Sequence, residues 1–213
     1  MYNPAHFKQQ DPQALRDLMA QYPLAALVTL GSQGLSATHL PLLYDPRGTR
    51  LGVLHGHMAK ANPQWSDLRA DVPALALFTG PQHYISPNWY PSKAEHGKVV
   101  PTWNYVVVHA RGPMRVIHDP QWLKENVSRL TAAHEAALTD PWNPAAAPAG
   151  HIENMVNAIV GIEITIESLE GKWKASQNRP EADRLGVIDA LRELGTPEAA
   201  RMAQIVSDSN RAK

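Results

Sequence analysis

Alternating apolar and polar residues predict β-strands over much of the chain. The first such run, residues 24–31, ends in Gly-Ser-Gln-Gly, which is typical of a hairpin turn. A second run begins directly after that turn, so an early antiparallel pair is expected. In chain order, we expect strands at residues 24–31, 35–45, 50–57, 73–80, 83–87, 102 to about 118, and 160–177.

Helical periodicity appears between these strands and after the last of them. Asp11 and Asp119 are each followed by proline, which combines a capping side chain with a residue favoured in the first helical turn. Asn62 is followed by proline in the same way. Helices are expected at residues 11–22, 61–70, 119–138, 151–159, 181–194 and 197–207.

This order of elements predicts a mainly β protein with helices, of the α+β class. Hairpin links come early and helical excursions later, which favours an antiparallel barrel with helices outside it over a doubly wound sheet. Neither GxGxxG nor GxxxxGK[ST] occurs, so Rossmann and P-loop nucleotide sites lack support. We expect one barrel domain at residues 1–180 and a helical extension at 181–213 packed on it.

Composition narrows the classes of function. The chain has 213 residues with 20 Lys and Arg against 20 Asp and Glu, so no global field attracts nucleic acid or an anionic membrane. It has no cysteine, which excludes disulfides, thiol nucleophiles and cysteine metal sites. The apolar runs are too short to cross a bilayer, and the start lacks a signal-peptide pattern. A cytoplasmic protein without a membrane partner is expected.

An early strand carries polar residues beside a proline. Thr38, His39 and Leu40 precede Pro41, and a proline cannot donate to a sheet ladder, so this strand is expected at an edge or a bulge. A free edge can offer its N–H and C=O groups to a flat heterocycle. The alternative is an edge that only protects against aggregation, which these residues alone favour.

The next segment combines a strand end with a helix start. Backbone N–H groups near Asn62, with Lys60 just before them, are typical of a phosphate site. An ordinary helix cap and a solvated lysine explain these residues equally well. His55 and His57 share one strand face, but no third ligand is evident, so no metal site is expected.

Two later segments gather groups that suit a flat polar ligand. Thr102, Trp103 and Asn104 form either a corner of the core or a ligand platform, because buried aromatic and amide groups need hydrogen-bond partners. Another group follows the last strand and can neutralise a phosphate, although a solvated strand end is the alternative. This last group consists of Lys174, Ser176 and Gln177.

Catalytic arrangements are missing from the pattern. Neither a Ser-His-Asp set nor a pair of carboxylates with the spacing of a general acid and base is evident. The sequence therefore favours binding over catalysis, and no catalytic residue is assigned.

Taken in series, these segments resemble a known family. The chain contains, in order, MYNPAHF, ATHLPLL, HGHMAKANPQW, GPQHYISPNWYPSKAEHGKVVPTWNY and VGIEITIESLEGKWKASQNRP. It resembles the PaiB-type FMN-binding negative transcriptional regulators, relatives of the split-barrel flavoproteins, from residue 1 to about 194. The resemblance implies a six-stranded antiparallel split β-barrel of the FMN-binding type, with peripheral helices and a C-terminal helical tail. It also implies a homodimer with one FMN at each subunit interface.

The resemblance implies three groups of flavin contacts. An early strand would line the isoalloxazine ring through its backbone, the strand-end segment would hold the phosphate, and the later segments would contact the ring and ribityl chain. Carried onto this sequence, these groups are Thr38, His39 and Leu40; His55, Lys60 and Asn62; and Thr102, Trp103, Asn104, Lys174, Ser176 and Gln177.

Two classes of function stay open. The resemblance implies a negative regulator of transcription, whereas a flavin-dependent oxidoreductase or a haem-binding or haem-degrading enzyme would use the same pocket. The haem alternative rests on His39, His55 and His57, because neutral imidazole is an axial ligand. The two tail helices outline a helix-turn-helix, but residues 181–213 carry five Lys and Arg against six Asp and Glu. Direct DNA binding is therefore disfavoured.

Overall fold

The computed structural model describes residues 1–211, and the chain forms two compact units. The first unit contains the two ends of the chain and one central segment: Met1–Leu18, Thr79–Val108 and the residues from Glu170 onward. The second unit contains Met19–Phe78 and His109–Leu169. The expected division at residues 180 and 181 stays a prediction, and residues 212–213 of that extension lie outside the described part.

The second unit begins with a hairpin and continues into a separate sheet. Strands β2 (Leu24–Gly31) and β3 (Gly34–Pro41) pair antiparallel, and Gly34 takes a positive φ of 102° at the expected turn. Alternate residues of β2 are buried, which confirms the period-two reading. The other sheet has the order β4-β5-β9-β8. Its strands are β4 (Leu43–Asp45), β5 (Val53–Ala59), β8 (Met114–Ile117) and β9 (Ile159–Thr165).

The second unit also contains helices that follow β8. α3 (Pro120–Glu135) begins after Asp119, whose carboxylate accepts a hydrogen bond from the Gln121 N–H at 3.0 Å. This confirms the expected cap. α4 (His151–Asn157) and the 3₁₀ turn η4 (Pro144–Ala146) follow it.

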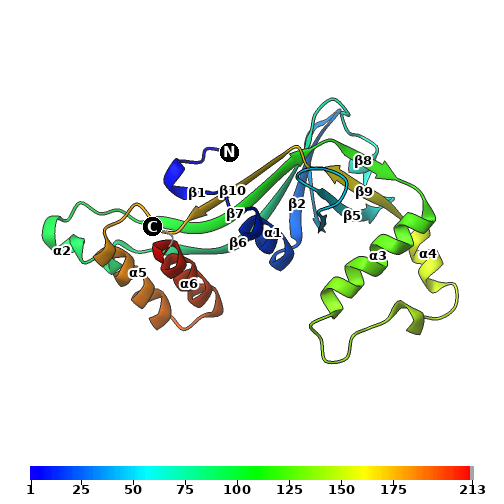
Figure 1. The fold of residues 1–213 in the computed structure, drawn as a ribbon. Coiled ribbons are helices and arrows are strands. Elements are labelled where there is room, and N and C mark those ends of the chain that lie inside the picture. Colours follow the sequence, from blue (N-terminus) through cyan, green and yellow to red (C-terminus); the bar gives the residue numbers. More distant parts are fainter. Residues whose placement is uncertain (212–213) are drawn as a thin grey trace. The chain divides into compact units, whose positions relative to one another are not determined.

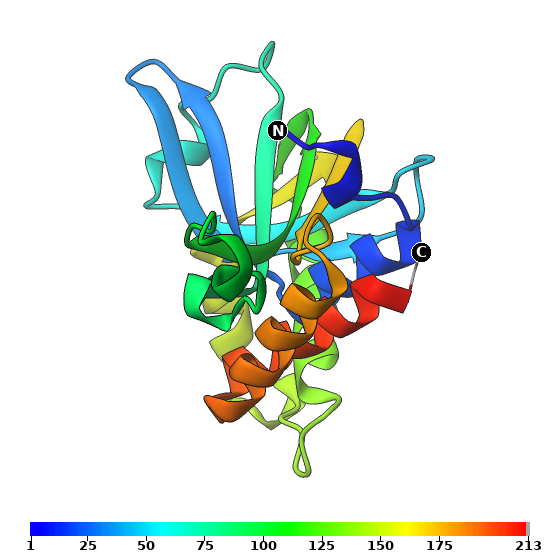
Figure 2. The same cartoon turned by 90° about the vertical axis from the view of Figure 1, so that its left-hand side faces the viewer.

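The first unit packs helices on one side of a sheet. It contains all or part of four strands in the order β1-β10-β7-β6: β1 (Lys8–Gln9), β6 (Ala74–Ile85), β7 (Thr102–Gly112) and β10 (Ser168–Lys174). The last three also have residues in the second unit. α5 (Glu181–Glu193) and α6 (Pro197–Arg211) lie side by side in both views of the ribbon (Figures 1 and 2). Their apolar faces share one buried cluster with Ile85, Tyr90 and Ala175.

Further helical elements lie in the first unit or begin in it. α1 (Pro12–Gln21) starts after Asp11, whose carboxylate accepts from the Gln13 N–H at 2.9 Å. α2 (Ser92–His96) lies in a segment expected to be a loop, together with the 3₁₀ turn η3 (Pro87–Trp89); another 3₁₀ turn, η1 (Ala5–Phe7), precedes β1. Among the described helices, none is long and apolar enough to cross a membrane.

Several expected strands have different limits in the structure. The strand expected at 102–118 breaks at Pro113, which has no N–H to donate, and the strand expected at 160–177 breaks after Thr165. Residues 35–45 divide in the same way at Leu42, whose N–H donates to the Pro23 carbonyl. Conversely, the expected turn near Pro81 is wrong, because β6 continues through it. The described residues thus form ten strands in antiparallel sheets, which confirms the α+β class.

The expected helix at 61–70 is also wrong. Only the 3₁₀ turn η2 (Pro63–Trp65) forms there. Asp67 instead accepts hydrogen bonds from the Ser32 N–H and hydroxyl at 2.9 and 3.0 Å, and the Arg69 N–H donates to the Leu30 carbonyl. These bonds to the β2–β3 hairpin draw the chain out of helical conformation.

Candidate functional site

The early group of predicted site residues lies on an edge strand of the second unit. Among the described strands, β3 lies at the end of its sheet and pairs with β2. Thr38 is half-buried, His39 is exposed and Leu40 is buried. The Thr38 hydroxyl accepts a hydrogen bond from the Asn62 Nδ2 at 2.9 Å. The structure therefore brings Thr38 and Asn62 together from two of the predicted segments.

A glutamine that the sequence analysis did not single out holds the η2 turn on the hairpin. Gln64 is 4% exposed, and its Nε2 lies 3.1 Å from the Leu27 carbonyl, 3.0 Å from the Thr29 hydroxyl and 3.2 Å from the Ser36 carbonyl. In the sequence, Gln64 is marked only by its position after Asn62-Pro63. In the structure, the Asn62 Oδ1 accepts a hydrogen bond from the Gln64 N–H at 2.9 Å. Gln64 thereby positions the Asn62 side chain beside β3.

His55 is enclosed by partners rather than open to a ligand. Its Nε2 lies 2.9 Å from the Glu163 carboxylate, its ring packs edge-on against Trp122, and Arg129 reaches its Nδ1 at 3.3 Å. A hydrogen bond from Arg115 is the main cause that lowers the pKa of Glu163, against the opposing effect of burial. Glu163 is therefore an acidic neighbour of His55 that the sequence did not indicate.

This enclosure does not make a metal site. Among the described residues, no group of three or more His, Asp or Glu side chains is arranged to hold a metal ion. Burial lowers the pKa of His57, which favours its neutral form.

Lys60 makes a helix-capping contact. Its Nζ donates to the carbonyl of Asn157, the last residue of α4, at 2.7 Å. A cation at a helix C-terminus is a stabilising arrangement. η2 has only three residues and supplies little helix dipole, so phosphate binding in this segment depends on Lys60 leaving that contact. The phosphate role of Lys60, His55 and Asn62 stays a prediction.

The later predicted residues meet in the first unit. The Lys174 ammonium donates to the Thr102 hydroxyl and, at 2.8 Å, to the Trp103 carbonyl. Burial is the main cause that lowers the pKa of Lys174, and the nearby Lys172 and Arg179 lower it further. Trp103 is 52% exposed, so its ring is available to a ligand.

The remaining three predicted residues contact one another or the backbone near the C-terminal end of β10. Asn104 is 1% exposed, its Nδ2 donates to the Ser176 hydroxyl at 2.9 Å, and its Oδ1 is buried without a partner. Ser176 has a positive φ of 62°, unusual for a residue with a side chain. The Gln177 carboxamide accepts from the Ala175 N–H and donates to the Trp173 carbonyl, both at 2.7 Å. Asn104, Ser176 and Gln177 thus have clear structural contacts of their own.

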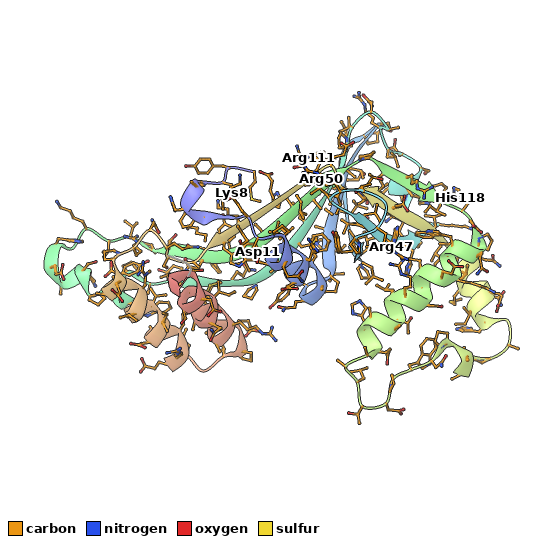
Figure 3. The ribbon with its side chains drawn as sticks, in the orientation of Figure 1. Lys8, Asp11, Arg47, Arg50, Arg111 and His118 are labelled. Atoms are coloured by element: carbon orange, nitrogen blue, oxygen red, sulfur yellow. The ribbon has the colours of Figure 1, made fainter. Side chains whose placement is uncertain are left out.

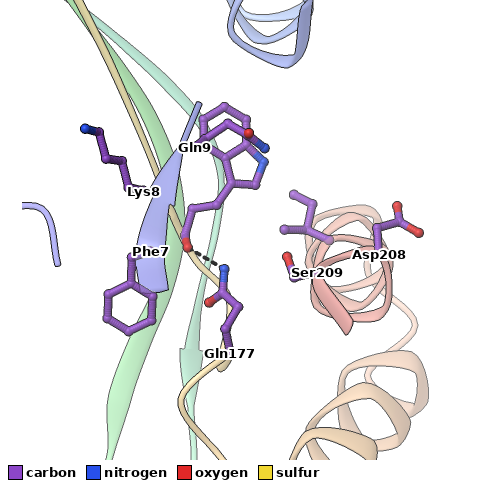
Figure 4. A pocket seen from close by; sticks show the side chains of 8 residues that line it. Phe7, Lys8, Gln9, Gln177, Asp208 and Ser209 are labelled. Atoms are coloured by element: carbon purple, nitrogen blue, oxygen red, sulfur yellow. Dashed lines mark hydrogen bonds between the residues drawn. The ribbon is translucent and has the colours of Figure 1, made fainter. Parts of the chain in front are cut away.

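A cavity of about 290 Å³ borders Gln177 in the first unit (Figure 4). Figure 4 shows the Gln177 carboxamide bonded across to the strand, with Asp208 and Ser209 on the facing helix. The lining residues are Phe7, Lys8, Gln9, Trp173, Gln177, Ile205, Asp208 and Ser209.

The predicted residues form one group in each unit. Thr38, His39, Leu40, His55, Lys60 and Asn62 belong to the second unit, and Thr102, Trp103, Asn104, Lys174, Ser176 and Gln177 belong to the first. Each group fits part of a flat anionic ligand. The second unit offers the free backbone edge of β3, and the first offers an exposed indole beside a partly buried ammonium.

Comparison with known proteins identifies the family. Residues 1–168 match a family described as "Putative FMN-binding domain". The chain is 31% identical to the protease synthase and sporulation protein PAI 2 of Bacillus subtilis, covering 98% of this chain and 97% of that protein. It is also 34% identical to an uncharacterized protein of Emericella nidulans, covering 100% of this chain and 99% of the relative.

Solved structures share the fold. The flavocytochrome Anf3 of Azotobacter vinelandii superimposes with a TM-score of 0.58 at 11% identity, covering 78% of this chain and 69% of that one. The FAD and heme binding protein of Mycobacterium smegmatis gives 0.55 at 16% identity, covering 78% and 73%. The split-barrel fold class is thus confirmed, and FMN is the cofactor that the family match gives. The chain belongs to the FMN-binding split-barrel family that includes the Bacillus PaiB-type protein.

Proposed function

We propose that this protein is an FMN-binding homodimer that acts as a negative regulator of transcription, as PaiB-type proteins do. The observation that carries the proposal is the family match over residues 1–168 together with the full-length similarity to the Bacillus subtilis protein named for protease synthesis and sporulation. A cytoplasmic location is part of the same proposal.

Each of the two groups would contribute its own flavin contacts. When bound, FMN supplies a redox-active isoalloxazine ring and a phosphate group. The β3 backbone at Thr38–Leu40 would hydrogen-bond a ring edge, and the exposed Trp103 indole would pack against a flat face. Lys174, held by Thr102 and the Trp103 carbonyl, would place a positive charge beside the ligand.

Flavin retention tests this part of the proposal. The wild-type protein is mixed with FMN, excess flavin is removed, and the visible absorption spectrum is recorded. We expect Trp103→Ala and Lys174→Met to weaken FMN binding about tenfold or more, since each loses a direct contact. Trp142→Ala and Lys98→Met are matched controls, because both side chains are exposed and lie outside the predicted contacts. No retained flavin in wild type would overturn the cofactor proposal.

The proposed dimer has an apolar surface to bury. A groove of about 350 Å³ in the second unit is lined almost wholly by apolar side chains around the β2–β3 hairpin, with Leu35 78% exposed. Leu24 on the same hairpin is 62% exposed. Exposed apolar patches of this kind mark protein interfaces. Sedimentation equilibrium should show a dimer, and Leu35→Asp should weaken it. Leu185→Asp is the control, because Leu185 is an exposed residue of α5, and this variant should stay dimeric.

The regulatory output would not use the tail helices as a DNA-reading pair. The apolar residues of α6, including Met202 and Val206, are buried in the cluster shared with α5. The exposed polar residues Glu198, Arg201, Gln204 and Asp208 give α6 no basic face. Fluorescence anisotropy with duplex DNA at low and moderate salt tests this point, and a steeply salt-dependent affinity would contradict it.

A second candidate is a flavin oxidoreductase or haem-binding enzyme. The specific observation is His39, whose exposed imidazole stands on the β3 edge strand, whereas His55 is enclosed by partners. Bleaching of bound flavin by NADPH would favour the oxidoreductase. A Soret band on haem addition that His39→Ala abolishes would favour the haem protein.

A further inference from the structure

One face of the sheet in the first unit collects positive charge. The helices α5 and α6 bury the opposite side together with Ile85 and Ala175. Lys8 on β1 pairs directly with Lys172 on β10, so both side chains lie on the same face. Lys174 is two residues further along β10 and shares that face. Three lysines thus stand together on the side away from the helices.

Lys172 is buried without a neutralising partner. It is 8% exposed, and its Nζ donates a hydrogen bond to the Tyr2 carbonyl at 3.0 Å. The ammonium also lies 5.6 Å from the centre of the Tyr2 ring and 5.4 Å from that of Tyr105. Rings and a carbonyl stabilise a cation only in part, because neither carries a negative charge.

Lys174 adds a second ammonium to the same ring. Its Nζ lies 6.0 Å from the centre of the Tyr105 ring, so the two lysines flank one phenol. Each ammonium has three N–H donors. Lys172 uses one on Tyr2, and Lys174 uses two on Thr102 and Trp103, which leaves donors on both for another acceptor.

The carboxylate of Glu170, two residues before Lys172 on β10, already has a partner. It accepts from the N-terminal ammonium at 2.9 Å. Among the described side chains, no Asp or Glu lies within ion-pair distance of Lys172 or Lys174. The lowered pKa of Lys174, caused by burial first and then by Lys172 and Arg179, agrees with an excess of positive charge.

We propose that Lys172 and Lys174, with the Thr102 hydroxyl and the Tyr105 ring, bind the oxyanion group of a small molecule other than the flavin. The ligand class is a carboxylate or phosphate monoester, whose oxygens accept charge-assisted hydrogen bonds from ammonium groups. The Tyr2 carbonyl occupies the place on Lys172 that one oxyanion oxygen would take. The site goes beyond the proposed function: Lys174 and Thr102 are shared with the predicted flavin contacts, whereas Lys172 and Tyr105 are not.

The N-terminal segment closes this site. The Asn3 side chain donates to the Gly171 carbonyl at 2.8 Å, and the N-terminal ammonium holds Glu170. The Tyr2 side chain is 86% exposed, so few contacts hold it over Lys172. The ligand would approach half-buried Lys174 first and replace the Tyr2 carbonyl on Lys172 second.

Calorimetric titration of the FMN-loaded protein with inorganic phosphate and, separately, with acetate tests the site. We expect at least one anion to bind, and Lys172→Met to weaken it about tenfold or more. Lys98→Met is the matched control, since Lys98 is an exposed lysine of the same unit, and its affinity should stay within about twofold of wild type. The better-bound anion tells whether the natural ligand carries a phosphate or a carboxylate.

Thermal unfolding separates a binding role from a structural one. The binding anion should raise the melting temperature of wild type and not that of Lys172→Met. Without anion, Lys172→Met should melt no lower than wild type, because methionine removes an uncompensated buried charge at similar volume. A large fall in melting temperature would assign Lys172 to holding the N-terminal segment and overturn the proposal.

Three other results would overturn it. These are binding of neither anion, equal binding by Lys172→Met and wild type, and phosphate binding only to flavin-free protein in competition with FMN. The last would assign the lysines to the flavin phosphate. If wild type retains no FMN, the same titrations on the flavin-free protein still decide the anion site, so the two proposals fail separately.

Discussion

Asp45 gives a quantitative test of how the second unit is held together. It is 4% exposed and accepts hydrogen bonds from the Arg47 N–H, Nε and Nη2 at 3.0, 2.9 and 2.7 Å. The Arg129 Nη2 of α3 adds another at 2.9 Å. Figure 3 labels Arg47, which lies two residues after the end of β4. The Arg47 hydrogen bonds are the main cause that holds the pKa of Asp45 far below its usual value of 3.8.

The expected magnitude follows from those bonds. Asp45→Asn keeps the shape but removes the charge that both arginines meet, and should cost about 2–3 kcal/mol of unfolding free energy at pH 7. A folded pKa below the unfolded one gives stability that is complete above the unfolded value and is lost as pH falls towards the folded value. The gap between wild type and Asp45→Asn should therefore shrink by about 1 kcal/mol between pH 5 and pH 3.

Urea unfolding followed by tryptophan fluorescence at pH 7, 5 and 3 measures this gap. Asp71→Asn is the matched control, because Asp71 and Arg69 form a pair with the same sequence spacing whose side chains are 66% and 56% exposed. Solvent screens such a pair, so that variant should match wild type at every pH. Equal stability of Asp45→Asn and wild type at pH 7, or a gap that stays constant down to pH 3, would refute the reasoning.

Three further changes have defined outcomes. Gln64→Leu removes the donor shared by three acceptors and should cost about 1–3 kcal/mol in urea unfolding, while Gln82→Leu, at an exposed position of β6, should change little. Gly161→Ala places a Cβ 2.4 Å from the Trp122 ring and should lower stability by about 1–3 kcal/mol with a shifted emission maximum; unchanged emission would contradict this packing. Met202→Ala should lower the unfolding free energy by about 2–5 kcal/mol, measured by calorimetry. A loss below about 1 kcal/mol would mean that the α5–α6 cluster is loosely packed.

Local signals predicted the ends of many elements correctly. The strand expected at 24–31 has those limits, and the helices after Asp11 and Asp119 begin at the proline that follows each cap. Caps, prolines and hairpin turns act within a few residues, so their effect can be read from short stretches. The same reasoning failed at 61–70, where Asp67 bonds to Ser32, a residue 35 positions away.

The candidate site was predictable only as a set of separate segments. Lys174 meets Thr102 across 72 positions, and His55 meets Glu163 across 108. No periodicity encodes such a pairing. For this reason the sequence did not indicate that Glu163 and Arg129 would enclose His55, or that Lys60 would cap α4.

The sequence by itself determined the α+β class, the family and the residue types from which a flavin-binding chain is built, because patterning, turns and motifs are properties of short stretches. The tertiary structure alone decided which of those residues are exposed to a ligand. Trp103 and the β3 edge are exposed, whereas His55 and Asn104 are enclosed. It also decided that Lys172 is buried with no carboxylate partner among the described residues, since burial and charge neutralisation depend on which distant strands pair.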